Sequence, residues 1–258
     1  MDDCEYHVPA GLSPALAVFV RGSADLLAQG QAPRTTPRFS LSGPFLGPRR
    51  AKSTPGTLAL VVLFRPGYVE PCLGVPAAAL VNRDVDMRDI ADTGRIDAMF
   101  DALDGASSIS GYLHIFQEYL LSTLDLDQKK SMAESFFEAH QKMFFPLIDL
   151  ALLFGIGRRQ LERRVKDVFG VSLRDVRSLS RWGLCMERLV NTRFEWGDLA
   201  HLAQDSGYFD QAHMTREFID LAGIAPLPLL KKIASDDPAY WAYRIRGEDF
   251  KNLFLPVR

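Results

Sequence analysis

The sequence predicts an α+β protein in which a small β-containing region precedes an all-α region with two helix-turn-helix units joined by a long linker helix. Roughly the first 75 residues consist of short apolar or alternating runs broken by proline and glycine, which is typical of strands and turns. From Tyr112 onwards the apolar residues recur at helical spacing instead. A run of strands followed by a run of helices is the pattern of α+β folds.

Three strands are expected in the first region, in the segments ALAVFVRG (15–22), RFSLSGPFLG (38–47) and TLALVVLF (57–64). The stretch AQGQAPRTTPR (28–38) predicts a turn-rich connection. After Gly67, the segments YVEPCLGVPAAAL (68–80) and VDMRDIADTGRIDAMFDAL (85–103) predict short helices, and GASSIS (105–110) predicts a loop. The strands and the helix after Pro66 enclose either a small apolar pocket or an ordinary filled core that serves as a dimer scaffold.

Composition places the chain among ordinary globular proteins, because 47% of its 258 residues are hydrophobic and 24% are charged. It has no 18-residue apolar run, and the acidic N-terminus MDDCEYHVP lacks the apolar segment of a secretory signal. The three cysteines are far apart and odd in number. This argues against a disulfide framework and favours a reducing compartment.

Charge is unevenly distributed along the chain. Residues 142–190 carry 10 Lys and Arg against 5 Asp and Glu, whereas residues 191–222 carry 2 against 6. The basic block can attract phosphates, or it can be a solvated helix face.

The first of two helical hairpins spans FPLIDLALLFGIGRRQLERRVKDVFG (145–170), with a turn at Gly155–Gly157. Its second helix is expected to bury Leu161, Val165 and either Val168 or Phe169. The opposite face carries Arg159, Glu162, Arg163 and Lys166, at spacings of i, i+3, i+4 and i+7.

The second hairpin spans GDLAHLAQDSGYFDQAHMTREFIDLAG (197–223). Its first helix is expected to bury Leu199, Ala200, Leu202 and Ala203. A turn at Ser206–Phe209 follows, Asp210 is a good N-cap, and Met214 and Phe218 anchor the second helix. Gln211, Ala212, Thr215 and Arg216 then face outwards.

The connection between the hairpins, Ser172 to Asn191, is predicted to be one helix with a serine N-cap. Helix, short turn with glycine, helix is the plan of a helix-turn-helix, whose second helix enters the major groove of DNA. A rigid connector of about 30 Å would place two such units in adjacent grooves, which lie about 34 Å apart on one face of the duplex.

Residues 146–232 resemble the DNA-binding domain of the AraC/XylS family of bacterial transcription regulators. The resemblance rests on GIGRRQLERRVKDVFGVS (155–172), RW…CMERL (181–189) and DLAHLAQDSGYFDQAHMTREF…AGIAP (198–226). It implies a cytoplasmic, nucleoid-associated regulator that binds double-stranded DNA and acts with RNA polymerase, without a cofactor. The residues that it implies as DNA-binding are Arg158, Arg159, Glu162, Arg163, Lys166, Gln211, Ala212, His213, Thr215 and Arg216. Residues 5–90 more faintly resemble an N-terminal domain that accompanies this module in some family members.

Domain boundaries follow from these patterns. We expect an N-terminal effector or oligomerisation domain at 1–125, the DNA-binding domain at 126–235 and a C-terminal tail at 236–258. The N-terminal domain is expected to bind a small-molecule effector, to form a homodimer, or both. The sequence gives no physical argument for which domain the tail packs against.

Both hairpins depart from the family pattern, and the changes after Phe218 put strong phosphate contacts by the second hairpin in question. Gly157 replaces the usual serine cap, Val165 replaces an aromatic residue, and acidic and apolar residues, rather than basic ones, follow Phe218. An alternative is therefore a sensor or interaction protein that retains the fold without binding DNA.

An enzyme is not expected. No G-x-S-x-G, H-E-x-x-H or P-loop motif is present, and the glycines at 155 and 157 lack the third glycine of a dinucleotide site because Gln160 stands there. His213 fits a packing or phosphate-facing histidine better than a metal ligand. Glu134, Glu138 and His140 fit a solvated helix face better than a metal site, and Cys72 is expected to be structural.

Overall fold

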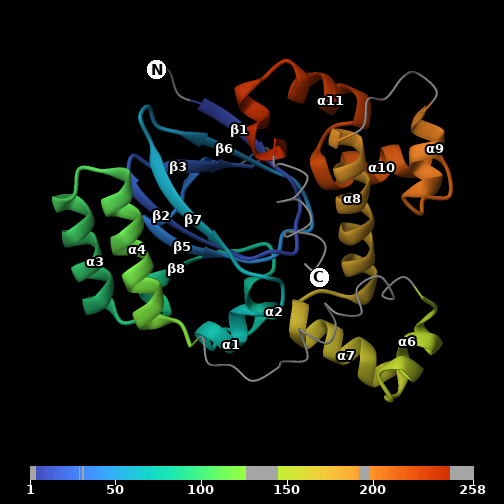
Figure 1. The fold of residues 1–258 in the computed structure, drawn as a ribbon, viewed down its shortest axis with the longest axis horizontal. Helices are drawn as coiled ribbons and strands as arrows, with labels where there is room; N and C mark the ends of the chain where they lie inside the picture. Colours follow the sequence, from blue (N-terminus) through green and yellow to red (C-terminus); the bar gives the residue numbers. More distant parts are fainter. Residues whose placement is uncertain (1–3, 29, 31, 126–144, 192–197, 245–258) are drawn as a thin grey trace.

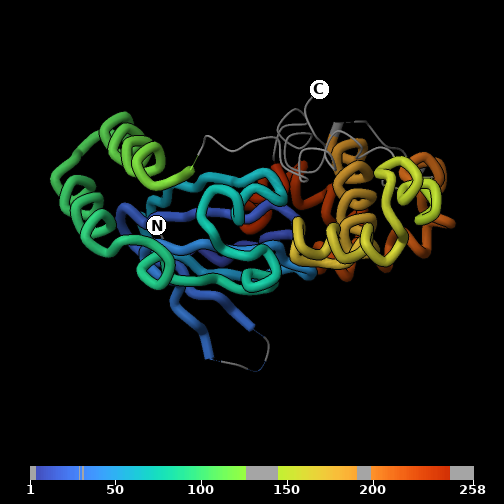
Figure 2. The backbone as a smooth tube through the Cα atoms, turned by 90° about the horizontal axis from the view of Figure 1, so that it is seen from below, coloured from blue at the N-terminus to red at the C-terminus, as the bar shows by residue number. Residues whose placement is uncertain are grey.

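The computed structural model describes residues 4–28, 30, 32–125, 145–191 and 198–244. A lobe of strands and short helices lies beside a helical lobe (Figures 1 and 2). The strands come first along the chain and the helices last, which confirms the predicted α+β class.

Two four-stranded antiparallel sheets form the N-terminal lobe, in the strand orders β1-β6-β3-β4 and β7-β2-β5-β8. The first sheet comprises β1 (Cys4–Val8), β6 (Arg49–Ser53), β3 (Ala24–Leu27) and β4 (Arg34–Thr35); the second comprises β7 (Leu58–Leu63), β2 (Ala15–Arg21), β5 (Phe39–Ser42) and β8 (Asp84–Asp86). The three strands expected from the sequence are β2, β5 and β7, and they lie side by side. In their register Val18 faces both Phe39 and Leu60, so apolar side chains stack across the sheet.

Two expectations for this lobe were wrong. Val85 and Asp86 begin the segment predicted as helix but pair with Leu41 and Ser40 of β5, and the helix α3 (Thr93–Gly105) starts later. The stretch predicted to be only a turn contains β4, which pairs with β3. Both strands are two or three residues long, and they exist because a neighbouring strand supplies their hydrogen bonds rather than because of their own propensity.

Helices α3 and α4 (Ile109–Thr123) cover one face of the second sheet (Figure 1). Side chains of β2 and β5 meet them in one continuous apolar cluster, in which Phe39 makes edge-on contacts with Phe100, Phe116 and Tyr119. Val69 of α1 (Val69–Leu73) and Leu80 of α2 (Ala77–Leu80) belong to the same cluster. A 3₁₀ turn, η1 (Met87–Asp89), joins β8 to the helices. The strands and the helix after Pro66 thus meet in a packed core.

The helical lobe contains α6 (Leu147–Leu153), α7 (Arg158–Phe169), α8 (Leu173–Asn191), α9 (Asp198–Asp205), α10 (Gln211–Ala222) and α11 (Pro226–Ala234). Helix α8 is the predicted connector, and Ser172 caps it: its hydroxyl accepts from the Asp175 amide at 3.2 Å, while Asp175 accepts from the Ser172 amide at 3.1 Å. Trp182 in the middle of α8 is completely buried and packs edge-on against Phe218 of α10.

The described part of the C-terminal tail contacts both lobes. It forms the 3₁₀ helix η3 (Pro238–Tyr243), in which the Tyr240 ring stacks on His7 of β1 with centroids 4.7 Å apart. On the other side, the Tyr243 hydroxyl donates to the carbonyl of Ala222 at the end of α10, at 3.0 Å. The lobes also share a core, because Ala10 and Leu12 belong to the apolar cluster of the helical lobe.

Candidate nucleic-acid interface

The first helix-turn-helix consists of α6 and α7, and the turn between them needs glycine at one position. Gly155 has φ +63°, in the left-handed region that most side chains avoid. Gly157 precedes α7 in an extended conformation and offers no side-chain cap. The α7 N-terminus therefore lacks the capping bond that a serine would give.

One face of α7 is buried and the other is exposed, as expected. Leu161, Val165 and Phe169 are buried, whereas Val168 is half-buried, so Phe169 completes the apolar face. The residues expected to contact DNA are all exposed: Arg158, Arg159, Glu162, Arg163 and Lys166.

The second helix-turn-helix consists of α9 and α10. Asp210 caps α10 as predicted, since its Oδ1 accepts a hydrogen bond from the His213 amide at 2.7 Å. Met214 and Phe218 are completely buried and fix the helix to its neighbours. Ala200 of α9, which was expected to face inwards, is exposed. The buried side of α9 is narrow, with Leu199, Leu202 and Ala203, and position 200 lies about 100° around the helix from position 199.

The outer face of α10 is polar and partly ordered by its own backbone. Gln211, Ala212 and Arg216 are exposed, and Thr215 is half-buried. The Thr215 hydroxyl donates to the Gln211 carbonyl at 2.9 Å, and Arg216 Nε donates to the Ala212 carbonyl at 3.3 Å. These bonds hold the Thr215 and Arg216 side chains against the helix backbone in the free protein.

His213 lies at the start of α10 with one ring nitrogen engaged. Its Nδ1 accepts from the Phe209 amide at 3.4 Å, and its ring meets Tyr208 edge-on at 5.3 Å. An imidazole that accepts at Nδ1 carries its proton on Nε2. Within the described residues no group of three or more His, Cys, Asp or Glu side chains could hold a metal ion. Glu134, Glu138 and His140 lie outside those residues.

A groove of about 660 Å³ brings α7, α8 and α10 to one side of the helical lobe. Glu162 of α7 and His213 and Arg216 of α10 all line it, so the exposed faces of the two helices meet across a shared depression. Among the described residues, its lining is Leu147, Glu162, Leu173, Arg174, Arg177, Ser178, Arg181, His213, Arg216, Glu217, Asp220 and Leu221.

Three arginines of α8 line this groove although they are not among the DNA-binding residues predicted from the sequence. Arg174, Arg177 and Arg181 recur at spacings of three and four, the periodicity of one helix face, and that spacing could have identified them. Arg174 is exposed, Arg177 donates to the Phe145 carbonyl, and Arg181 forms an ion pair with Glu217.

Glu217 is an acidic residue of α10 that does not face solvent. Arg181 binds it through two nitrogens, with Nη2 2.6 Å from Oε1 and Nε 3.1 Å from Oε2, and the Ser178 hydroxyl donates to Oε1. Burial by itself would raise the Glu217 pKa, but hydrogen bonds from Arg181, Ser178 and Tyr208 hold that pKa below its usual value. One of the six carboxylates of residues 191–222 is therefore neutralised internally and adds little repulsion towards a polyanion.

All three cysteines are free in the structure, and Cys185 is completely buried beside Met214. Burial raises the pKa of its thiol to about 11. Among the described residues, no helix is long and apolar enough to cross a membrane.

Comparison with protein families places residues 150–232 in a family whose model is described as a helix-turn-helix domain. Solved structures similar to the chain include ToxT from Vibrio cholerae. An apo ToxT variant from strain SCE256 aligns over 90% of this chain and 94% of its own, with 10% identity and a TM-score of 0.48. Wild-type ToxT with a bound unsaturated fatty acid aligns over 89% of this chain and 91% of its own, with 12% identity and a TM-score of 0.47. A comparison with curated proteins finds no match.

Proposed function

We propose that this protein, whose residues 150–232 form an AraC-type helix-turn-helix domain, is a transcription regulator that recognises specific duplex DNA by inserting α7 and α10 into adjacent major grooves. The observation that carries the proposal is the shared groove: Glu162 of α7 and His213 and Arg216 of α10 line it together with residues of α8. The 19 residues of α8 span about 28 Å, close to the 34 Å repeat of the duplex.

The exposed residues of α7 suit base recognition. Arg159 and Arg163 can each donate two hydrogen bonds to guanine O6 and N7, and Glu162 can accept from cytosine N4. Arg158 and Lys166 flank them and suit phosphate oxygens.

On α10, Gln211 suits adenine and Ala212 suits a thymine methyl group. His213, with its Nε2 proton, and Thr215 add short polar contacts, and Arg216 supplies the charge. The row of Arg174 and Arg177 on α8 fits the phosphates that cross between the two grooves.

The remaining parts take supporting roles in this proposal. Residues 126–235 form the DNA-binding domain. Residues 1–125 respond to a small molecule, join two copies of the chain, or do both. Residues 236–258 form a tail, and its described part, up to Arg244, contacts both lobes. Contact with RNA polymerase would convert DNA binding into regulation.

A second candidate is a sensor or interaction protein that keeps the fold without binding DNA. Residues 191–222 carry six acidic residues and two basic ones, and this negative charge, which would repel DNA phosphates, favours the second candidate. The internal pairing of Glu217 with Arg181 weakens that argument, because the charge facing outwards is less negative than the count suggests.

Selection from a random-sequence DNA pool with the full-length chain at low salt distinguishes the two. The proposal predicts that a defined duplex is enriched and shifted in a gel, and that the double variant Arg159→Ala, Arg163→Ala fails to enrich it. Absence of any enriched or shifted duplex would establish the second candidate instead.

The role of the N-terminal lobe has its own test. Thermal-shift screening with metabolites should reveal a ligand if the lobe is an effector domain. No stabilising compound, together with a dimer in sedimentation analysis, would favour the scaffold role.

A further inference from the structure

The N-terminal lobe touches the C-terminal ends of both recognition helices, α7 and α10. At the end of α10, the Ala10 amide donates to the Leu221 carbonyl at 2.8 Å. At the end of α7, Gly170 packs so closely on α2 that a Cβ there would lie 2.6 Å from the Ala77 carbonyl oxygen. Each recognition helix therefore has a second attachment besides its packing on α8.

The attachments involve two neighbouring loops, and Ala10 is connected to the first of them because its neighbour Gly11 forms a two-bond backbone bridge with Phe45. Residues 43–48, the first loop, lie against the end of α10: a Cβ on Gly223 would be 3.4 Å from Pro48 Cγ, and Leu46 packs against the core of the helical lobe. Residues 76–83, the second loop, contain α2 and lie against α7, with Val81 packed on the same core (Figure 1). The distance between the two loops thus affects the distance between the two recognition helices.

Asn82 makes two of the hydrogen bonds that join the two loops, and the backbone amide of Gly43 adds a third by donating to the Arg83 carbonyl at 3.0 Å. The Asn82 backbone N–H donates to the Pro44 carbonyl at 2.8 Å, and its side-chain Oδ1 accepts from the Leu46 backbone N–H at 2.9 Å. Its φ is +55°, a left-handed conformation that asparagine and aspartate adopt more readily than other residues with a side chain. Asparagine therefore suits this position in two ways: it tolerates the left-handed backbone, and its side chain provides the acceptor for the Leu46 N–H.

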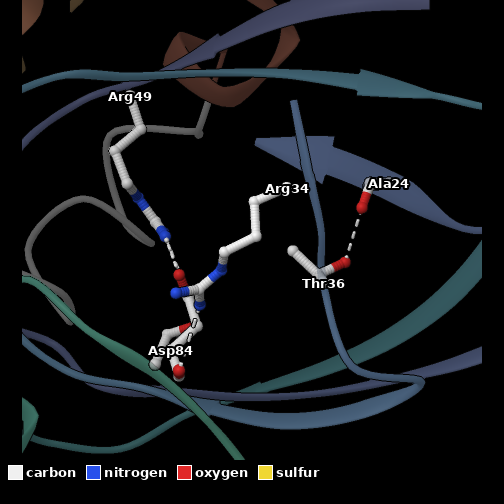
Figure 3. Close-up of polar contacts among 6 residues, drawn as sticks. Ala24, Arg34, Thr36, Arg49 and Asp84 are labelled. Atoms are coloured by element: carbon white, nitrogen blue, oxygen red, sulfur yellow. Dashed lines mark hydrogen bonds and ion pairs between the residues drawn. The ribbon is translucent and has the colours of Figure 1, made fainter. Parts of the chain in front are cut away.

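A partly buried ion pair reinforces the same junction (Figure 3). Arg49, which follows the first loop, places Nη1 2.9 Å from Oδ1 of Asp84, which follows the second loop. The Arg49 guanidinium also lies 3.4 Å above the Phe45 ring. Such a pair tolerates little displacement, because separating the charges leaves the largely buried Asp84 carboxylate without its partner.

We propose that Asn82 is a positioning residue that fixes the spacing of α7 and α10 by joining residues 43–48 to residues 76–83. The inference rests on the proposed function, for which it names the element that sets the distance between the two DNA-reading helices. Helix α8 holds both helices by side-chain packing, and the joined loops hold their C-terminal ends. Two attachments per helix restrict rotation as well as separation.

The test first measures the helix spacing without DNA. Spin labels on cysteines introduced at Asp167 of α7 and Ile219 of α10, both exposed, report the distance distribution in full-length protein. Cys4 and Cys72 are replaced by serine, and Cys185 stays because it is completely buried. We expect one narrow distance distribution in the parent protein. Asn82→Gly should broaden it, because glycine keeps the left-handed backbone but loses the side-chain acceptor. Asn82→Asp should leave it narrow, because aspartate keeps the backbone conformation and the acceptor.

Arg50→Ala is the matched control, because it removes an exposed ion pair with Glu5 from the strand that carries Arg49. It should leave the distribution narrow. An unchanged width in Asn82→Gly, or equal broadening in Arg50→Ala, would overturn the proposal. If Asn82→Gly does not fold, Asp84→Asn replaces it with the same expectations, because it weakens the second tie at this junction.

The second measurement uses the duplex selected by the parent chain, a version with five base pairs inserted between the two contacted grooves, and a half-site. In Asn82→Gly the preference for the parent spacing over the inserted spacing should fall about tenfold. With the two helices less rigidly connected, the effective concentration of the second recognition helix at its groove is lower. The half-site affinity of Asn82→Gly should stay unchanged, and Asn82→Asp should restore the preference. A fully retained spacing preference in Asn82→Gly overturns the proposal. If the parent binds no duplex, the proposed function fails, and the spin-label distances still decide the role of Asn82.

Discussion

Arg181 of α8 and Glu217 of α10 form a two-point ion pair that links the linker helix to the second recognition helix. The carboxylate is buried and the guanidinium is largely so. Because the guanidinium matches the carboxylate in geometry, the pair fixes the orientation of α10 as well as its distance from α8.

Replacing Glu217 with glutamine should lower the free energy of unfolding by about 2 kcal/mol near neutral pH, because Arg181 then loses its charged partner. The Glu217 pKa is depressed in the folded state. The stability that ionisation contributes is therefore fully present above the unfolded pKa of about 4.3 and is lost as the pH falls through the lower folded value. Urea unfolding at several pH values should show the variant and the parent converging in acid. Asp220→Asn, an exposed change on the same helix, is the control, and an equal loss there would contradict the role of the pair.

Arg163→Ala should weaken specific DNA binding by about 1–3 kcal/mol and relax the preference at one base pair. The reason is that an exposed arginine at this position of α7 can bind both acceptors of a guanine. Binding to a panel of single-base variants of the selected duplex measures both effects. Lys231→Ala, an exposed basic residue of α11, is the control for charge alone. Unchanged affinity and preference in Arg163→Ala would show that this face does not contact bases.

The two recognition units should differ in the salt dependence of binding. Phosphate contacts by exposed basic residues release counterions, and the salt slope grows with their number. From the sequence, Arg158, Arg164, Lys166 and their neighbours are expected to provide most of the slope. In the structure Arg158 and Lys166 are exposed, but Arg164 is half-buried and should contribute less.

Lys166→Ala should therefore reduce the slope more than Arg216→Ala, because residues 191–222, which contain Arg216, carry six acidic residues against two basic ones. Titrations at several salt concentrations compare the two. A larger loss of affinity and slope in Arg216→Ala would show that the second unit grips DNA despite its charge.

Gly170→Ala should destabilise the protein by about 2 kcal/mol or more, since a left-handed conformation and a backbone contact both exclude the added methyl group. Its φ is +75°, and the Cβ would press on the Ala77 carbonyl. Gly155→Ala is a matched control, because Gly155 has φ +63° with no atom within 4 Å of an added Cβ. Its cost should be about 1 kcal/mol, from conformation alone. Equal melting temperatures for the two variants would mean that the contact between α7 and α2 contributes nothing.

Local patterns determined much of the helical lobe. The spacing of Leu161, Val165 and Phe169 defines which side of α7 is buried, and Asp210 caps α10 through a bond that spans three residues. Such features depend on neighbours within one or two turns, so the sequence predicts them directly. The three apolar runs that became β2, β5 and β7 were predictable for the same reason.

Tertiary structure decided the features that join distant residues. Glu217 counts as a repelling charge in the sequence, and only the crossing of α8 and α10 places Arg181 beside it. Asp84 belongs to a strand because β5 provides its partner, and Asn82 joins two loops whose contacts lie on different helices. The sequence alone determined which faces of α7 and α10 are polar, because periodicity is local. How those faces are spaced and which charges remain free was decided by packing between segments far apart in the chain, where each contact depends on the placement of all the others.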